Sequence, residues 1–127
     1  MSNNYTILLV EDYPADAAIA TRRILSLWPS CHVKKVSNVS DALCEIDQSM
    51  FDLILLDLNL PDSSGARTVY DIRRANDVVP IIAVTGLLTD FILDDCMRLG
   101  ANYILDKSKV MDDHFFDILN THVGVPH

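Results

Sequence analysis

Five polar residues end or follow apolar runs that lie far apart in the sequence, and their types suit one kind of chemistry. Glu11 and Asp12 follow ILLV, Asp57 ends LILLD, Thr85 ends IIAVT and Lys107 follows YILD. Carboxylates that come together resist joint ionisation unless a cation lies among them, and a few hard oxygen ligands suit Mg²⁺. An aspartate is already ionised at neutral pH, so Asp57 could attack a phosphoryl group without a general base.

The elements that must position these residues alternate between short apolar runs and helical patterns. The apolar, β-branched runs, which predict strands, cover residues 5–10, 33–36, 53–56, 81–85 and 103–105. The patterns with apolar residues at i, i+3 and i+4, which predict helices, cover residues 14–28, 40–48, 65–75, 89–99 and 112–123. Five such strand–helix units predict a doubly wound α/β fold, with a five-stranded parallel sheet and helices on both faces. At 127 residues the chain is expected to form a single domain over residues 1–127.

The placement of the strands decides whether the five polar residues meet. Lys34 and Lys35 make the second strand the most polar one, which favours an edge position. The order 2-1-3-4-5 is expected by analogy with doubly wound folds of this size. In that order the ends of strands 1, 3, 4 and 5 line one crevice, where open α/β sheets bind ligands. Each polar residue alone has an ordinary structural explanation, but their shared position at the carboxyl ends of different strands favours a site.

Composition excludes several classes of function. With 10 Lys and Arg against 18 Asp and Glu, the formal charge is 10 − 18 = −8, which argues against nucleic-acid binding. The three cysteines, Cys31, Cys44 and Cys96, show no metal-ligand spacing and are typical of reduced thiols in a cytosolic protein. The chain shows neither a signal peptide nor a stretch long enough to span a membrane, so a cytoplasmic location is expected.

Four segments carry a resemblance to a known family. ILLVED, LILLDLNLPDSSG, PIIAVTG and GANYILDKS resemble the receiver domain of two-component response regulators, the CheY-like phosphoacceptors of histidine-kinase signalling. The resemblance spans nearly the whole chain and is also the source of the flavodoxin-like strand order 2-1-3-4-5. It implies a signalling phosphoacceptor with slow self-dephosphorylation, not an enzyme in its own right.

The resemblance also implies roles for the residues of the crevice. Asp57 would accept the phosphoryl group from a histidine kinase or a histidine phosphotransfer protein and would be a ligand of Mg²⁺. Asp12 would bind the metal directly and Glu11 mainly through water. Asn59 would supply a backbone carbonyl to the metal.

Two departures from the family pattern concern the response to phosphorylation. Thr85 and Lys107 would be the pair that senses the phosphoryl group, but Ser108 stands where the family has a proline after a cis bond. A cis bond before another residue type costs about 2.5–4 kcal/mol, so either strain is tolerated or the loop differs. The family's switch aromatic falls on Ile104, and Tyr103 would point to the opposite face of the strand. A muted or rewired switch is therefore predicted at Ile104.

The end of the sequence and one apolar cluster bear on how a signal would leave the protein. Only four residues follow the last predicted helix, so we expect no output domain and action by contact with a downstream protein that the sequence does not identify. Leu87, Leu88 and Phe91 either form a partner surface or pack against the sheet or the next helix. Phe115 and Phe116 cannot both face the core, so one of them is expected to join the same surface.

Three other functions compete with the phosphoacceptor. The first is a pseudo-receiver that keeps the fold and acts as an adaptor without being phosphorylated. The second is a flavin-binding protein, but the acidic loop EDYPAD does not suit a phosphate. The third is an aspartyl phosphatase, which would need an aspartate at the position of Asn59 and a nucleophile on an earlier strand.

Overall fold

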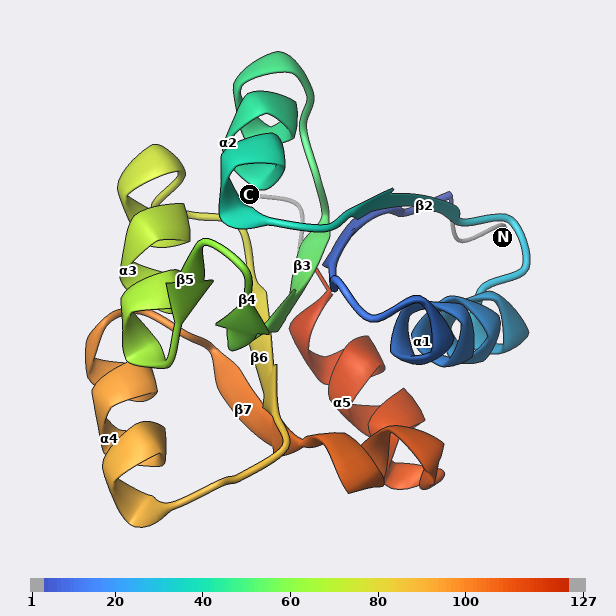
Figure 1. The fold of residues 1–127 in the computed structure, drawn as a ribbon. Coiled ribbons are helices and arrows are strands. Elements are labelled where there is room, and N and C mark those ends of the chain that lie inside the picture. Colours follow the sequence, from blue (N-terminus) through green and yellow to red (C-terminus); the bar gives the residue numbers. More distant parts are fainter. Residues whose placement is uncertain (1–3, 124–127) are drawn as a thin grey trace.

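The computed structural model describes residues 4–123, which form one α/β layer structure (Figure 1). The strands are β1 (Thr6–Val10), β2 (His32–Val36), β3 (Leu53–Asp57), β4 (Asn59–Leu60), β5 (Ser63–Ser64), β6 (Ile81–Thr85) and β7 (Tyr103–Asp106). The helices are α1 (Pro14–Leu27), α2 (Val39–Gln48), α3 (Ala66–Ala75), α4 (Asp90–Arg98) and α5 (His114–His122), with a 3₁₀ segment η1 (Lys107–Met111). Residues 124–127, on which the expected absence of an output domain depends, lie outside the described residues.

The main sheet has five parallel strands in the order β2-β1-β3-β6-β7. This is the predicted order 2-1-3-4-5, because β4 and β5 form a separate two-stranded hairpin. The lysine-bearing β2 lies at an edge, as predicted, whereas every residue of β3 and β6 is buried. A parallel strand that is covered on both faces consists of a continuous apolar run, and LILL and IIAV fit that requirement.

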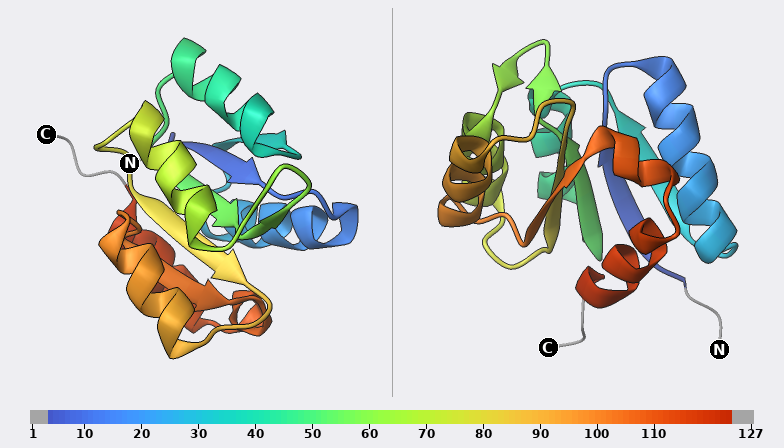
Figure 2. Two further views of the ribbon diagram at one scale, coloured as in Figure 1. Left: turned by 60° about the vertical axis from the view of Figure 1, so that its left-hand side comes forward. Right: turned by 90° about the horizontal axis from the view of Figure 1, so that it is seen from below.

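Helices cover both faces of the sheet, and the sheet separates the core into two parts (Figure 2). On one face, residues of β1, β3 and β6 such as Leu9, Leu55 and Val84 pack with α1 and α5. On the other face, alternate residues of the same strands pack with α2, α3 and α4. Because side chains alternate along a strand, this division fixes which residues of each strand can meet a given helix.

Two elements were not predicted. The β4–β5 hairpin follows β3, and its two-residue strands are too short to produce a pattern. The segment η1 takes the residues directly after β7, so the last helix begins at His114 and not at Asp112. The Asp106 side chain accepts a hydrogen bond from the Ser108 backbone N–H at 2.9 Å, which favours a helical turn at that point.

The structure shows which of the apolar residues around α4 and α5 are exposed and which are packed. Leu87 and Phe91 are 71% and 84% exposed and Leu88 is 37% exposed, so the cluster does not pack into the core. Phe115 is buried, whereas Phe116 is half-buried under the Arg23 guanidinium, 4.2 Å from the ring centroid. The expectation that one phenylalanine joins the exposed cluster was wrong, because Phe116 faces α1 instead.

Among residues 4–123, the helices are all too short or too polar to cross a membrane.

Candidate functional site

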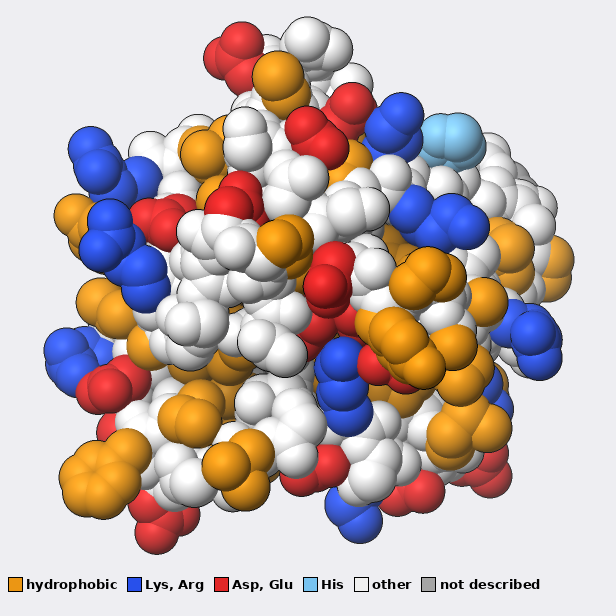
Figure 3. Space-filling view, in the orientation of Figure 1, with side chains coloured by type: hydrophobic (Ala, Val, Ile, Leu, Met, Phe, Trp, Pro, Cys, Tyr) orange, Lys and Arg blue, Asp and Glu red, His pale blue; other side chains and the backbone are white. Residues whose placement is uncertain are grey.

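Three carboxylates meet at the carboxyl ends of β1 and β3. Glu11 and Asp12 directly follow β1, Asp57 is the last residue of β3, and one oxygen of each lies within 4.8 Å of the others. Asp57 is only 3% exposed, whereas Asp12 is exposed. Figure 3 shows acidic and basic side chains together near the centre of the face onto which these strand ends open. The predicted convergence of Glu11, Asp12 and Asp57 is therefore present.

Lys107 reaches this cluster from the end of β7. Its ammonium lies 3.4 Å from Asp57 Oδ2, 3.2 Å from Glu11 Oε1 and 2.8 Å from Asp16 Oδ2. The pairing of β6 with β3 and of β7 with β6 brings the start of η1 to this edge of the sheet. Lys107 is thus where the sequence predicted it, although fifty positions separate it from Asp57.

The loop around Lys107 resolves the question that Ser108 raised. The Lys107–Ser108 peptide bond is trans. The Ser108 backbone N–H and hydroxyl both donate to Asp106 Oδ1, at 2.9 and 2.8 Å, and η1 begins here. Of the two possibilities left by the sequence, the structure has the altered loop.

The electrostatics of the site reflect more negative than positive charge. Burial, and then the neighbouring Asp57 carboxylate, raise the pKa of Glu11 to about 7. Burial acts against the charge on Lys107, but the hydrogen bond to Asp16 and the charges of Asp57 and Glu11 outweigh it and raise the pKa of the lysine. The Lys107 ammonium therefore faces carboxylates that would be more stable with a further cation among them.

The donor set fits a hard divalent cation. Carboxylate oxygens at this separation, one buried and one exposed to water, are the ligands that Mg²⁺ takes while keeping part of its water shell. Glu11, Asp12 and Asp57 would hold the ion, and its charge would offset the repulsion by Asp57, which adds to burial in raising the pKa of Glu11.

The segment after Asp57 is held by its own backbone. The Asn59 N–H donates to Asp57 Oδ1 at 3.2 Å, and Gly65 N–H donates to the Leu58 carbonyl at 2.8 Å, which closes the β4–β5 hairpin. At the hairpin turn, Asp62 accepts hydrogen bonds from the backbone N–H groups of Val39 and Ser40 at the start of α2. The role of the Asn59 carbonyl as a metal ligand stays a prediction.

Thr85 stands at the end of β6, one residue beyond the partner of Asp57 in the sheet register. It is nearly buried, and its hydroxyl accepts a hydrogen bond from the Leu87 backbone N–H at 3.3 Å. Its side chain therefore contacts the loop before α4. Its predicted contact with a phosphoryl group on Asp57 stays a prediction.

Ile104 and Tyr103 face opposite sides of the sheet. Ile104 is buried among the residues that pack with α2, α3 and α4, and it pairs with Ala83. Tyr103 packs on the α1 and α5 side, where its ring lies 5.3 Å from that of His122. The position of the family's switch aromatic is thus occupied by an aliphatic residue. Its role as a switch stays a prediction.

Asp16 is the residue that the sequence analysis missed. It lies in the first turn of α1 and makes the shortest of the three contacts to Lys107. Asp16 and Lys107 also border a cavity of about 90 Å³ whose other walls are mostly apolar, among them Leu9, Ile19 and Val110. The acidic loop EDYPAD was visible in the sequence, but an acid in a first helical turn is common and did not point to Lys107.

Comparison with known proteins agrees with this geometry. The chain matches the family of response regulator receiver domains over residues 7–117. It is 31% identical over 122 residues to the transcription factor SKN7 of Candida albicans, a match that covers 96% of this chain and 21% of that protein. The chain thus spans about a fifth of the length of this relative.

Solved structures show the same fold. The Mn²⁺-bound form of the response regulator Rcp1 superposes with a TM-score of 0.80 at 23% identity, covering 97% of this chain and 99% of that one. The phosphorylated cyanobacterial phytochrome response regulator RcpA gives a TM-score of 0.76 at 23% identity, covering 93% and 90%. The architecture predicted from the sequence is confirmed.

Proposed function

We infer the function from the family: the chain belongs to the response regulator receiver domains, and we propose that Asp57 accepts a phosphoryl group in a Mg²⁺-dependent reaction. The donor would be a phosphohistidine of a histidine kinase or of a histidine phosphotransfer protein. The phosphorylated chain would then change its affinity for a downstream protein. We place this exchange in the cytoplasm, and we propose that residues 1–127 act as one receiver domain.

One observation carries the proposal. Asp57 is almost wholly buried and ends an apolar strand, yet it faces the Lys107 ammonium and two further carboxylates at the mouth of the sheet. A structural acid in that position would be neutralised by its partners. Here the local charge stays negative, as expected of a site that awaits a divalent cation.

The chemistry needs little beyond position and charge. An Asp57 oxygen would form a bond to phosphorus as the bond from phosphorus to the histidine nitrogen breaks, and that nitrogen would leave with the electron pair. Mg²⁺, when bound, supplies positive charge for the phosphoryl oxygens. Lys107 would pair with a second phosphoryl oxygen, and the Thr85 hydroxyl would donate to a third. Water would later attack the phosphorus and release inorganic phosphate.

Two solved response regulators of the same fold support these steps, because one contains a divalent metal ion and the other is phosphorylated. One response regulator of this fold was solved with Mn²⁺, and another was solved in its phosphorylated form. Both belong to proteins that share less than a quarter of their sequence with this chain, so they support the chemistry only through the common fold.

The exposed apolar cluster of Leu87, Leu88 and Phe91 supports a signalling contact. It begins two residues after Thr85, whose hydroxyl accepts a hydrogen bond from the Leu87 backbone N–H. A change in the Thr85 hydroxyl bond would therefore move the loop that carries these side chains. We propose this surface as the contact for the downstream protein.

Incubation with acetyl phosphate tests the proposal. With Mg²⁺, intact-protein mass spectrometry should show the mass gain of one phosphoryl group, and the gain should vanish in Asp57→Asn and after chelation of the metal. Asp47→Asn is a suitable control, because Asp47 is an exposed aspartate near the end of α2 and outside the site. Absence of any adduct, or an adduct that survives in Asp57→Asn, would favour the adaptor that is never phosphorylated.

A further inference from the structure

The Lys107 ammonium lies among three carboxylates, with which a phosphoryl group on Asp57 would compete. The Lys107 ammonium donates hydrogen bonds to Asp16 and Asp57 at 2.8 and 3.4 Å, and a Glu11 oxygen lies 3.2 Å away as a third carboxylate. A phosphoryl oxygen on Asp57 would have to compete with these carboxylates for the ammonium. The question is which carboxylate remains as a competitor.

The arrangement of the carboxylates answers this question. Glu11 and Asp57 belong to the group that could hold a divalent cation, whereas Asp16 does not. A cation would draw the first two carboxylates to itself, and Asp57 would also carry the phosphoryl group. Asp16 stands apart in the first turn of α1 and already makes the shortest contact.

We propose that Asp16 is a positioning residue that holds the Lys107 ammonium toward α1 and competes with the phosphoryl group on Asp57 for it. The inference rests on the proposed function, because it needs a phosphoryl group at Asp57. Asp16 lowers the affinity of the site for that group and shortens the time for which the signal persists. When Lys107 turns to the phosphoryl oxygen, α1 loses its ion pair with the start of η1.

The surroundings allow this movement. The cavity of about 90 Å³ that both side chains border leaves space beside the lysine, and its apolar walls can contact the aliphatic part of the chain. The side chains of Lys107 and Asp16 are 28% and 35% exposed, so the ion pair is partly screened by water. An ion pair of this kind is weak enough for a phosphoryl group to displace it.

Titration with fluoroberyllate, a phosphoryl mimic, tests the inference in the presence of Mg²⁺. Asp16→Asn should bind the mimic about two- to fivefold more tightly than the unaltered chain, the range expected for loss of a partly exposed ion pair. The Lys107 ε-methylene resonance of the free protein should also shift in Asp16→Asn, which a general change in charge would not cause.

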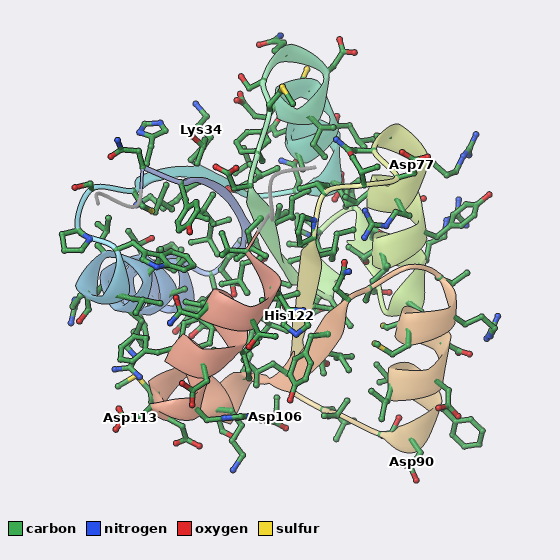
Figure 4. The ribbon with its side chains drawn as sticks, turned by 180° about the vertical axis from the view of Figure 1, so that it is seen from behind. Lys34, Asp77, Asp90, Asp106, Asp113 and His122 are labelled. Atoms are coloured by element: carbon green, nitrogen blue, oxygen red, sulfur yellow. The ribbon has the colours of Figure 1, made fainter. Side chains whose placement is uncertain are left out.

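Asp90→Asn is the matched control. Asp90 is an exposed aspartate in the first turn of α4, so the variant removes the same charge and the same helix-terminal interaction. Figure 4 shows Asp90 at the start of α4, on the other side of the molecule from α1. Neither the affinity nor the lysine resonance should change in this variant, and thermal unfolding should confirm that both variants fold.

The outcomes separate the two proposals. Unchanged or weaker binding in Asp16→Asn, or tighter binding with an unaltered Lys107 resonance, would overturn the inference and leave the proposed function intact. Failure of the unaltered chain to bind fluoroberyllate with Mg²⁺ would overturn the proposed function, and the role of Asp16 with it.

Discussion

The rings of Tyr103 and His122 lie with their centroids 5.3 Å apart on the face of the sheet that α1 and α5 cover. Ile104, the next residue, is buried on the opposite face. The Tyr103 ring therefore lies on the face of the sheet opposite to α4. To reach the α4 face it would have to reverse the alternation of side chains along β7.

We expect Tyr103 to keep its contact with His122 when Mg²⁺ and fluoroberyllate are added. The ring contacts can be followed by nuclear Overhauser effects, with the Tyr5 and Trp28 pair, at 4.8 Å between centroids, as a reference that should not respond. A Tyr103 ring that leaves His122 and contacts Thr85 would show that the switch was assigned to the wrong position.

Phe115 and Phe91 give a matched comparison of a buried and an exposed ring. Phe115 is fully buried, so Phe115→Ala should lower the free energy of unfolding by about 3–5 kcal/mol, through lost burial and the cavity left behind. Phe91 is 84% exposed, and Phe91→Ala should change the stability by less than about 0.5 kcal/mol. Urea unfolding at neutral pH measures both.

The same pair of variants separates stability from recognition. If the cluster around Phe91 is a partner surface, Phe91→Ala should weaken capture of the downstream protein while the unfolding transition stays where it was. A large loss of stability in Phe91→Ala would mean that this side chain is packed and does not form a free surface.

The architecture was predictable because it depends on short-range patterns. The runs LILL in β3 and IIAV in β6 are apolar at every position, which requires cover on both faces and hence a parallel sheet with helices on each side. The polarity of β2 likewise predicted an edge. The order of the strands was supplied by the family resemblance and not by these patterns.

The residues of the site that could be predicted are those at the ends of strands. Glu11, Asp57 and Lys107 end or follow strands, so the fold alone brings them together. Asp16 depends on how the start of α1 lies against η1, which is set by packing between segments 91 residues apart. The hydrogen bonds of Asp62 to the start of α2 are equally non-local.

Alanine should be costly at one glycine and tolerated at another. Gly100 has φ +118, and an added Cβ would lie 2.8 Å from Arg73 Cγ, whereas an added Cβ at Gly86 would meet nothing within 4 Å. Gly100→Ala should therefore lower the stability by about 1–3 kcal/mol, through backbone strain and displacement of the arginine.

The displaced guanidinium would also lose backbone partners, because Arg73 donates to the carbonyls of Gly100, Val79 and Asn76. Gly86→Ala serves as the control, with an expected change within about 0.5 kcal/mol. Thermal unfolding of both variants gives the comparison, and equal stabilities would contradict the strained conformation at Gly100.

Asp62 ties the hairpin after Asp57 to α2, and its contribution should depend on pH. Hydrogen bonds from the backbone N–H groups of Val39 and Ser40 lower the pKa of Asp62 below its ordinary value of 3.8. The unfolded chain therefore binds a proton at a higher pH than the folded one, so this stabilisation is present above about pH 4 and is lost as pH falls through the lowered pKa. Asp62→Ala should cost about 1 kcal/mol at pH 7, the usual size of a lost helix cap.

The difference between Asp62→Ala and the unaltered chain should shrink below pH 3.8, and urea unfolding at pH 7 and pH 3 measures it. Asp47→Ala, at an exposed position near the end of the same helix, is the control and should not lower stability, because a negative charge there opposes the helix dipole. Since Asp57 and the hairpin are adjacent, Asp62→Ala should also loosen the Asn59 N–H bond to Asp57, which faster amide exchange at Asn59 would report. A pH-independent difference would mean that Asp62 acts through packing and not through its charge.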